Sequence, residues 1–144
     1  MQQIIESLSR QHGELVQVST EMIRWLDVGK LQRDGAAFAF RALGALGNIF
    51  DRHLATEERS LYPGLLHHPD PQLRALAERF WAERAQVRAE FAEYRASWPS
   101  SAAIAIAPWQ FIEETRAILG TLWRRMKQED EVLHPEVVRA SASE

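Results

Sequence analysis

The chain has 144 residues, enough for one domain with a substantial hydrophobic core. It is 46% hydrophobic and 26% charged, with a formal net charge of −3 and with acidic and basic residues interspersed, so the composition predicts neither a nucleic-acid nor a membrane partner. The absence of cysteine excludes disulfides, thiolate metal ligands, iron–sulfur clusters and thiol catalysis.

The first residues of the chain bear on the cellular location of the protein. Residues 1–6 lack the basic patch and apolar run of a secretory signal. No stretch approaches the roughly 18 uninterrupted apolar residues of a membrane span. Together with the absence of cysteine, these features predict a cytoplasmic protein.

Apolar residues at helical spacing predict an all-α fold, with helices over about 2–26, 36–61, 70–98 and 108–133. We expect a loop from Asp27 to Gly35, a stop at Pro63-Gly64, a linker of small residues over 100–107 and a final break at Pro135. Short connections between long amphipathic helices favour an up-down-up-down four-helix bundle, a single domain over residues 1–144. The apolar face of the second helix is predicted to contain Phe40, Leu43, Leu46, Phe50, Leu54 and Leu61.

The two halves of the chain resemble each other. The segment from His53 to Pro63 is similar to that from Arg125 to Pro135, an offset of 72 residues that also carries His12 onto Arg84. Each half is therefore predicted to be a helix pair, and the two pairs to pack about a pseudo-twofold axis that brings equivalent positions together.

Six polar side chains are predicted to point at one level of the interior. Residues four apart share a helix face, as His53 does with Glu57 and Arg125 with Glu129. Imidazoles and carboxylates arranged in this way inside a bundle are typical of a non-haem metal site. The six are His12, His53, Glu57, Arg84, Arg125 and Glu129.

This pattern resembles the hemerythrin-like (HHE) cation-binding domains. The features that carry the resemblance are a histidine on the first helix, a His-x-x-x-Glu motif followed by Glu-x-x-Leu-Tyr-Pro on the second, and a second such motif on the fourth. The resemblance extends from about Ile4 to Val138 and implies a four-helix bundle that holds two irons through histidines and bridging carboxylates. It places His12, His53, Glu57 and Glu129 at ligand positions.

Three positions depart from the family pattern. Arg84 and Arg125 stand where the family has histidine, and Phe80 stands where oxygen carriers have a further histidine. A guanidinium stays protonated and has no lone pair to donate, so it is not an ordinary metal ligand. All three departures fall on the side of the second iron, and we therefore expect no di-iron centre.

Two functions remain open from the sequence. The leading interpretation is a metal-free core in which Arg84 and Arg125 form buried, bidentate pairs with Glu57 and Glu129, so that the protein is a non-catalytic scaffold that binds a protein partner or a small ligand. The alternative is a protein that binds one divalent ion, iron rather than zinc or manganese, and senses oxygen, nitric oxide, redox state or metal supply. Its ligands would be His12, His53, Glu57 and Glu129. No nucleophile–base pair or phosphate-binding loop is present, so we do not expect an enzyme.

The remaining histidines and basic residues give weaker indications of function. His67 and His68 fall in a proline-rich loop and are expected at the surface, and His134 is expected to pack at the end of the bundle. Arg125 could instead belong to a solvated basic face of the last helix with Arg124 and Lys127.

Overall fold

A computed structural model describes residues 1–142; the last two residues of the predicted domain, 143–144, lie outside the described part. No strand occurs among the described residues, which confirms the predicted all-α fold. None of the helices described is both long enough and apolar enough to cross a membrane. The elements are α1 (Gln2–Ile23), α2 (Val28–Lys30), η1 (Leu31–Gly35), α3 (Ala36–Thr56), η2 (Glu57–Leu61), α4 (Tyr62–Leu66), α5 (Pro71–Ser97), α6 (Ser101–Ile106), α7 (Pro108–Gln128), η3 (Glu129–Leu133) and α8 (His134–Ala142). Here η2 and η3 are π-helical turns, whereas η1 is a kink with non-helical backbone at Arg33.

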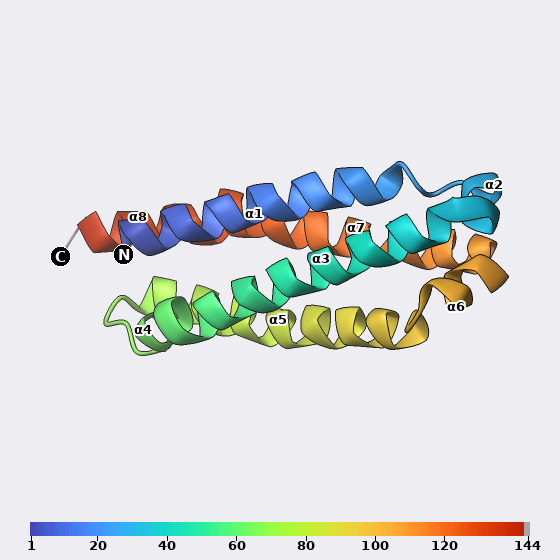
Figure 1. The fold of residues 1–144 in the computed structure, drawn as a ribbon. Helices are drawn as coiled ribbons and strands as arrows, with labels where there is room; N and C mark the ends of the chain where they lie inside the picture. Colours follow the sequence, from blue (N-terminus) through green and yellow to red (C-terminus); the bar gives the residue numbers. More distant parts are fainter. Residues whose placement is uncertain (143–144) are drawn as a thin grey trace.

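The long helices α1, α3, α5 and α7 lie alongside one another in a helical bundle, and consecutive long helices run in opposite directions (Figure 1). Helix α1 packs on α3, and α5 packs on α7. The short elements α2 and α6 cover one end of the bundle, whereas α4, α8 and the N-terminus lie at the other end (Figure 1).

Two segments predicted to be loops contain helical turns. The Asp27 carboxylate accepts a hydrogen bond from the Lys30 N–H at 2.9 Å and so starts α2 inside the predicted loop. The Ser100 hydroxyl accepts one from the Ala103 N–H at 3.1 Å and starts α6 inside the predicted linker. Capping side chains at these positions satisfy the first free N–H groups of each short helix. The first helix also ends at Ile23, three residues earlier than predicted.

The predictions that Pro63-Gly64 and Pro135 end their helices are wrong, because α4 and α8 follow the π turns directly. A proline has no N–H and its ring collides with the carbonyl four residues earlier, so the helix widens locally instead of stopping. The Tyr62 N–H accordingly bonds to the Glu57 carbonyl, and the His134 N–H to the Glu129 carbonyl. The two π turns begin at Glu57 and Glu129, which are separated by the same 72 residues as the two similar segments of the sequence.

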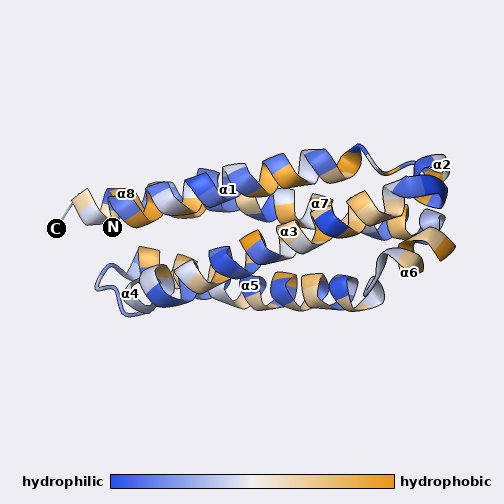
Figure 2. Cartoon of the chain, viewed as in Figure 1, coloured by the Kyte–Doolittle hydropathy of each residue, from blue (hydrophilic) through white to orange (hydrophobic). Residues whose placement is uncertain are grey.

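A buried polar layer divides the hydrophobic core into two clusters. One cluster lies on the side of Leu15 and Leu122, and the other on the side of Leu8 and Leu133. Hydrophilic and hydrophobic residues are mixed along the long helices (Figure 2), and in α1, α3 and α7 they lie on opposite faces, as in an amphipathic bundle. Phe40 is an exception to the predicted apolar face: it is 37% exposed, because Ala36 and Ala39 occupy the buried side of the first turns of α3.

The junction of η1 and α3 should tolerate no side chain at Gly35. A Cβ there would lie 2.6 Å from the Lys30 carbonyl oxygen, so the backbone would have to move. We expect Gly35→Ala to lower the free energy of unfolding by about 1–3 kcal/mol. In the exposed middle of α3, a Cβ on Gly44 meets nothing within 4 Å, and Gly44→Ala should raise it by about 0.5–1 kcal/mol. Urea unfolding of both variants checks the contrast, and a change of the same sign in both would contradict it.

Candidate metal centre

Three donor atoms converge in the polar layer between the two hydrophobic clusters. His12 Nε2 of α1 lies 2.8 Å from Glu129 Oε1 of η3, and His53 Nε2 of α3 lies 3.3 Å from the same oxygen. The two Nε2 atoms are 3.3 Å apart. All three residues are buried, with exposed fractions of 1–4%. Among the described residues, these three form the one group of His, Asp or Glu side chains close enough together to share an ion.

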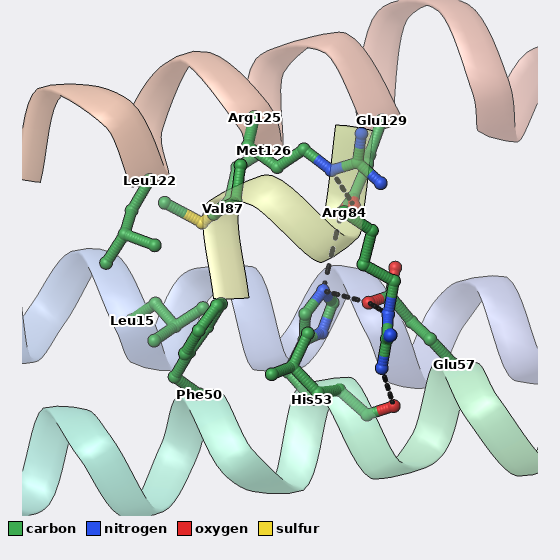
Figure 3. A pocket seen from close by; sticks show the side chains of 11 residues that line it. Leu15, Phe50, His53, Glu57, Arg84, Val87, Leu122, Arg125, Met126 and Glu129 are labelled. Atoms are coloured by element: carbon green, nitrogen blue, oxygen red, sulfur yellow. Dashed lines mark hydrogen bonds and ion pairs between the residues drawn. The ribbon is translucent and has the colours of Figure 1, made fainter. Parts of the chain in front are cut away.

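Glu57 lies at the edge of this group. Its Oε1 is 3.7 Å from His53 Nε2 and 3.5 Å from Arg84 Nε (Figure 3). Its Oε2 is buried and has no hydrogen-bond partner among the described residues. The structure thus brings Glu57 to the predicted site, but outside the closely spaced triad.

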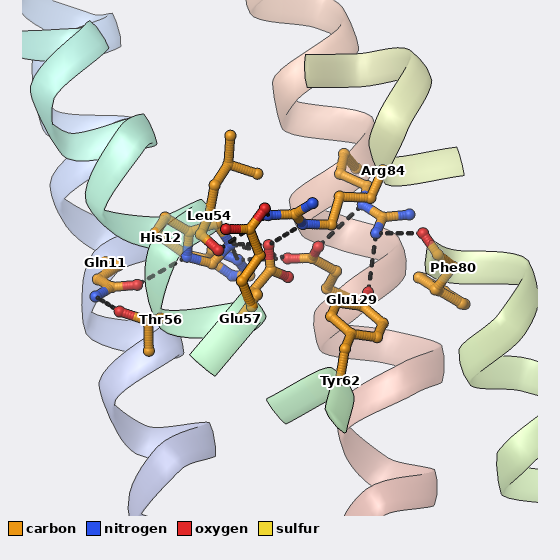
Figure 4. A network of polar contacts seen from close by, with 12 residues as sticks. Gln11, His12, Leu54, Thr56, Glu57, Tyr62, Phe80, Arg84 and Glu129 are labelled. Carbon is orange, nitrogen blue, oxygen red and sulfur yellow. Dashed lines mark hydrogen bonds and ion pairs between the residues drawn. The ribbon is translucent and has the colours of Figure 1, made fainter. Parts of the chain in front are cut away.

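Arg125 connects Glu129 to Phe80 of α5 and to Tyr62 of α4. Its Nε donates to Glu129 Oε2 at 2.9 Å, and its Nη2 donates to the Phe80 carbonyl at 2.9 Å and to the Tyr62 hydroxyl at 3.1 Å (Figure 4). The guanidinium also lies over the Phe80 ring, 4.9 Å from its centroid. Arg125 is 7% exposed, so the interpretation of this residue as part of a solvated face is wrong.

Arg84 also lies inside, but its contacts differ from those predicted. Its Nη2 donates to the Leu54 carbonyl at 2.9 Å and contacts Glu58 Oε1 at 3.0 Å, both closer than Glu57. Arg84 approaches Glu57 through its Nε, at 3.5 Å, and Arg125 approaches Glu129 through its Nε, at 2.9 Å. The expected bidentate geometry is therefore not formed, since each guanidinium divides its donors among several acceptors.

The two carboxyl groups of the layer have different proton affinities. Burial and the charge of Glu129 raise the pKa of Glu57 well above its usual value, against the opposing effect of the two arginines. Burial also acts to raise the pKa of Glu129, but hydrogen bonds from His12 and His53 and the charge of Arg125 outweigh it and hold this pKa well below its usual value. Glu129 is thus the carboxylate that keeps its negative charge.

A small cavity lies beside the triad, with about 20 Å³ available to the centre of a water-sized sphere. Apolar side chains, including Leu15, Phe50 and Leu122, line one part of it, and His53 and the charged residues line the other (Figure 3). The space suits a molecule about the size of water.

Sequence reasoning missed two residues that contact the imidazoles from outside. His12 Nδ1 lies 3.0 Å from Asp130 Oδ1, and His53 Nδ1 lies 2.9 Å from Gln11 Oε1. Each follows or precedes a predicted site residue in the chain, but neighbours in sequence do not share a helix face, so periodicity gave no signal for them. Burial acts to lower the pKa of His12, but the hydrogen bond and charge of Glu129, with those of Asp130, raise it overall.

The other histidines contribute no donor atom to the triad. His67 is exposed, as predicted, and His68 is half-buried. His134 is buried and stacks on His12, with ring centroids 5.8 Å apart. It therefore packs under the site without adding a donor to the triad.

Comparison with protein families gives a match between residues 3–137 and the model of the hemerythrin HHE cation-binding domain. The chain belongs to this family. Searches of curated proteins and of solved structures found no match.

The residues of this HHE domain fit a single ion. Two ligand atoms each about 2.1 Å from one ion and at right angles are about 3 Å apart, close to the 2.8 and 3.3 Å separations in the triad. Two imidazoles with one carboxylate are also the donor set of many non-haem iron sites. On the other side of Glu129, Arg125 occupies the second carboxylate oxygen and offers only donors.

Truncating Arg125 tests whether this arrangement stabilises the fold. In metal-free protein we expect Arg125→Ala to cost about 3–5 kcal/mol, because the buried carboxylate of Glu129 loses its guanidinium partner. Its exposed neighbour Arg124 makes a weak hydrogen bond to Thr121, at 3.4 Å, and Arg124→Ala should cost less than about 1 kcal/mol. Chemical denaturation of both variants measures the difference; similar small losses would contradict a structural role for Arg125.

Proposed function

We propose that the protein is a non-catalytic, one-metal hemerythrin-like module, an up-and-down bundle of two similar helix pairs. The proposal rests on the convergence of His12 Nε2, His53 Nε2 and Glu129 Oε1 within 3.3 Å of one another. Three acceptor atoms cannot approach so closely inside a protein without a proton or a cation among them. A divalent ion satisfies all three at once.

The arginines limit the site to one ion. Glu129 offers one oxygen to the imidazoles, and Arg125 holds the other at 2.9 Å, so Glu129 is not free to bridge two ions. Arg84 and Arg125 also stand where the family has imidazole ligands. A second ion would have only Glu57 as a new protein ligand, too few donors for a stable site.

The fixed positive charges weaken the proposed site without abolishing it. At about 5 Å and an effective dielectric near 20, each repulsion between an ion and a guanidinium costs on the order of 3 kcal/mol. Structural zinc sites in small domains bind with roughly 10–16 kcal/mol. Glu58 and Glu83 offset part of the repulsion, since they contact Arg84 at 3.0 Å and Arg125 at 3.6 Å.

We favour iron(II) as the ion, and we infer a sensing role from the open coordination positions and the cavity beside the site. Two imidazoles and one carboxylate leave coordination positions open on such an ion, which can then bind a small exogenous molecule. The adjoining cavity, partly apolar and bordered by His53, is of suitable size for such a molecule. The rest of the layer holds charged groups in place and contains no nucleophile–base pair.

A second candidate is the metal-free scaffold. The observation that favours it is the 2.8 Å contact between His12 and Glu129, which a protonated imidazole satisfies without an ion. In this case Arg84 and Arg125 take over the charge of the lost metal entirely.

Metal content separates these two functions. Protein produced with iron available, or reconstituted with Fe(II) or Zn(II) and desalted, should carry about one ion per chain. His12→Ala and His53→Ala should abolish binding, whereas His67→Ala removes an exposed histidine and should leave it unchanged. Elemental analysis gives the stoichiometry. A metal-free wild type would support the scaffold, and two irons with near-ultraviolet oxo-bridge absorption would contradict both proposals.

Reversing the departures from the family should rebuild the second half-site. The double variant Arg84→His with Arg125→His removes two fixed charges and adds two neutral donors beside Glu57. We expect it to bind up to two ions and to gain about 2.7 kcal/mol of stability at free metal a hundredfold above the dissociation constant. Thermal unfolding with and without Zn(II) measures the gain. As a control, Arg124→His with Lys127→His adds two imidazoles on the exposed side of α7 and should leave the stoichiometry at one.

A further inference from the structure

The imidazoles of His12 and His53 have the same orientation in the site. Each directs Nε2 toward Glu129 Oε1 and toward the other ring, and each uses Nδ1 for a contact outside the triad. A neutral imidazole carries one proton, so the outer contact decides which nitrogen keeps its lone pair.

For His53 this choice follows from a one-way chain of hydrogen bonds. The Thr56 hydroxyl donates its single proton to the Arg52 carbonyl at 3.0 Å, so its oxygen can only accept from Gln11. The Gln11 amide therefore turns its Nε2 to Thr56, at 3.0 Å, and its Oε1 to His53 Nδ1, at 2.9 Å (Figure 4). Because that oxygen is an acceptor, His53 Nδ1 must be the donor. The Nε2 lone pair then faces the triad.

For His12 the outer partner is a carboxylate. Asp130 Oδ1 lies 3.0 Å from His12 Nδ1, and an ionised carboxylate offers only acceptors. The same oxygen is 3.4 Å from His134 Nδ1, which is too far for a strong hydrogen bond and leaves His12 as its closer partner. His12 Nδ1 is thus also a donor. By the same argument, without an ion the Nε2 of His12 donates to the ionised Glu129 at 2.8 Å, and a bound ion would take the place of that proton.

We propose that Gln11, Thr56 and Asp130 are positioning residues, which keep a proton on Nδ1 of both imidazoles and direct Nε2 of each ring at the metal position. The proposal rests on the one-metal function, and it explains how the donors are assembled before an ion arrives. Neutral imidazole in water prefers the opposite tautomer, with the proton on Nε2. Without these partners the site must change both tautomer and ring orientation on binding, and loss of such outer partners typically weakens metal affinity 10–100-fold.

The tautomers can be read in metal-free protein. Two-bond ¹H–¹⁵N spectra distinguish a proton on Nδ1 from a proton on Nε2. In the wild type we expect the Nδ1–H form for His53, and for His12 a proton on both nitrogens, because its Nδ1 faces Asp130 and its Nε2 faces the ionised Glu129. Thr56→Val and Gln11→Leu should shift His53 toward the Nε2–H form without changing His12, and Asp130→Ala should remove the Nδ1 proton of His12 without changing His53.

The chain supplies matched controls and conservative replacements. Thr20 makes the same hydroxyl-to-carbonyl bond within its helix, to Val16 at 2.9 Å, but at the surface, so Thr20→Val controls for loss of that bond. Gln17→Leu and Glu131→Ala alter exposed neighbours of the other two residues. Thr56→Ser, Gln11→Glu and Asp130→Asn keep the required hydroxyl or acceptor oxygen and should restore the wild-type tautomers.

Zinc affinity, measured by competition with a chelator, completes the test. We expect Thr56→Val, Gln11→Leu and Asp130→Ala each to bind Zn(II) 10–100-fold more weakly, and the conservative replacements to recover most of the loss. All three residues are half-buried or exposed, so the variants should unfold at denaturant concentrations close to that of the wild type.

Three results would overturn the proposal: no Nδ1 proton on either histidine in the wild type, Nδ1 protonation unchanged in the variants, or zinc affinity unchanged despite altered protonation of Nδ1. Failure of the one-metal function is a separate outcome. A wild type that binds no zinc yet has the Nδ1 proton on both rings would contradict the one-metal function and leave the positioning role intact. A wild type that binds one zinc but lacks these Nδ1 protons without the ion would contradict only the positioning role.

Discussion

The burial of the Glu129 carboxylate is the constraint on which the polar layer depends. A carboxylate that is 1% exposed must have partners for both oxygens, because an uncompensated charge in the interior is among the most costly defects that a fold can contain. Arg125 donates to Oε2, and the Nε2 atoms of His12 and His53 lie 2.8 and 3.3 Å from Oε1. These contacts link three long helices at one level, so the charge of one side chain sets the packing of the bundle around it.

The two halves of the bundle meet this constraint differently, although their backbones are alike. Each half has a π turn that begins at a glutamate and is followed by a proline. In the first half the residue four positions before that glutamate is His53, whose ring nitrogen can give a lone pair to an ion. In the second half it is Arg125, which can only donate protons. In the proposed site, this difference at equivalent positions places a permanent cation where the other half has a metal ligand, so that one face of the layer would hold an ion and the other would not.

Much of this arrangement could be predicted from the sequence, and the reasons for the rest are physical. Helical spacing gave the all-α fold and the inward direction of His12, Arg84 and Arg125, since a polar residue between apolar positions of one stripe has to lie in the core. It did not give the continuation of helices past Pro63, because a proline can be accommodated by a wider turn as well as by a helix end. The sequence also paired charges one to one. A guanidinium has five donors, however, and in the structure Arg125 directs its Nε to a carboxylate and its Nη2 to a hydroxyl and a carbonyl.

The outer hydrogen bonds decide what the triad can bind, and they were beyond the reach of periodicity. Gln11 and Asp130 are adjacent in sequence to His12 and Glu129, yet each reaches a histidine on another helix. The direction of the bond between Gln11 and His53 is set by a group farther from the site, the Arg52 carbonyl, which accepts the only hydroxyl proton of Thr56. In the proposed metal site, the orientation of the donors is therefore specified by more than the ligands themselves. Residues that would not touch the ion orient the two imidazoles, and the sequence signal for them is a hydrogen-bond direction that becomes visible only once the helices are packed.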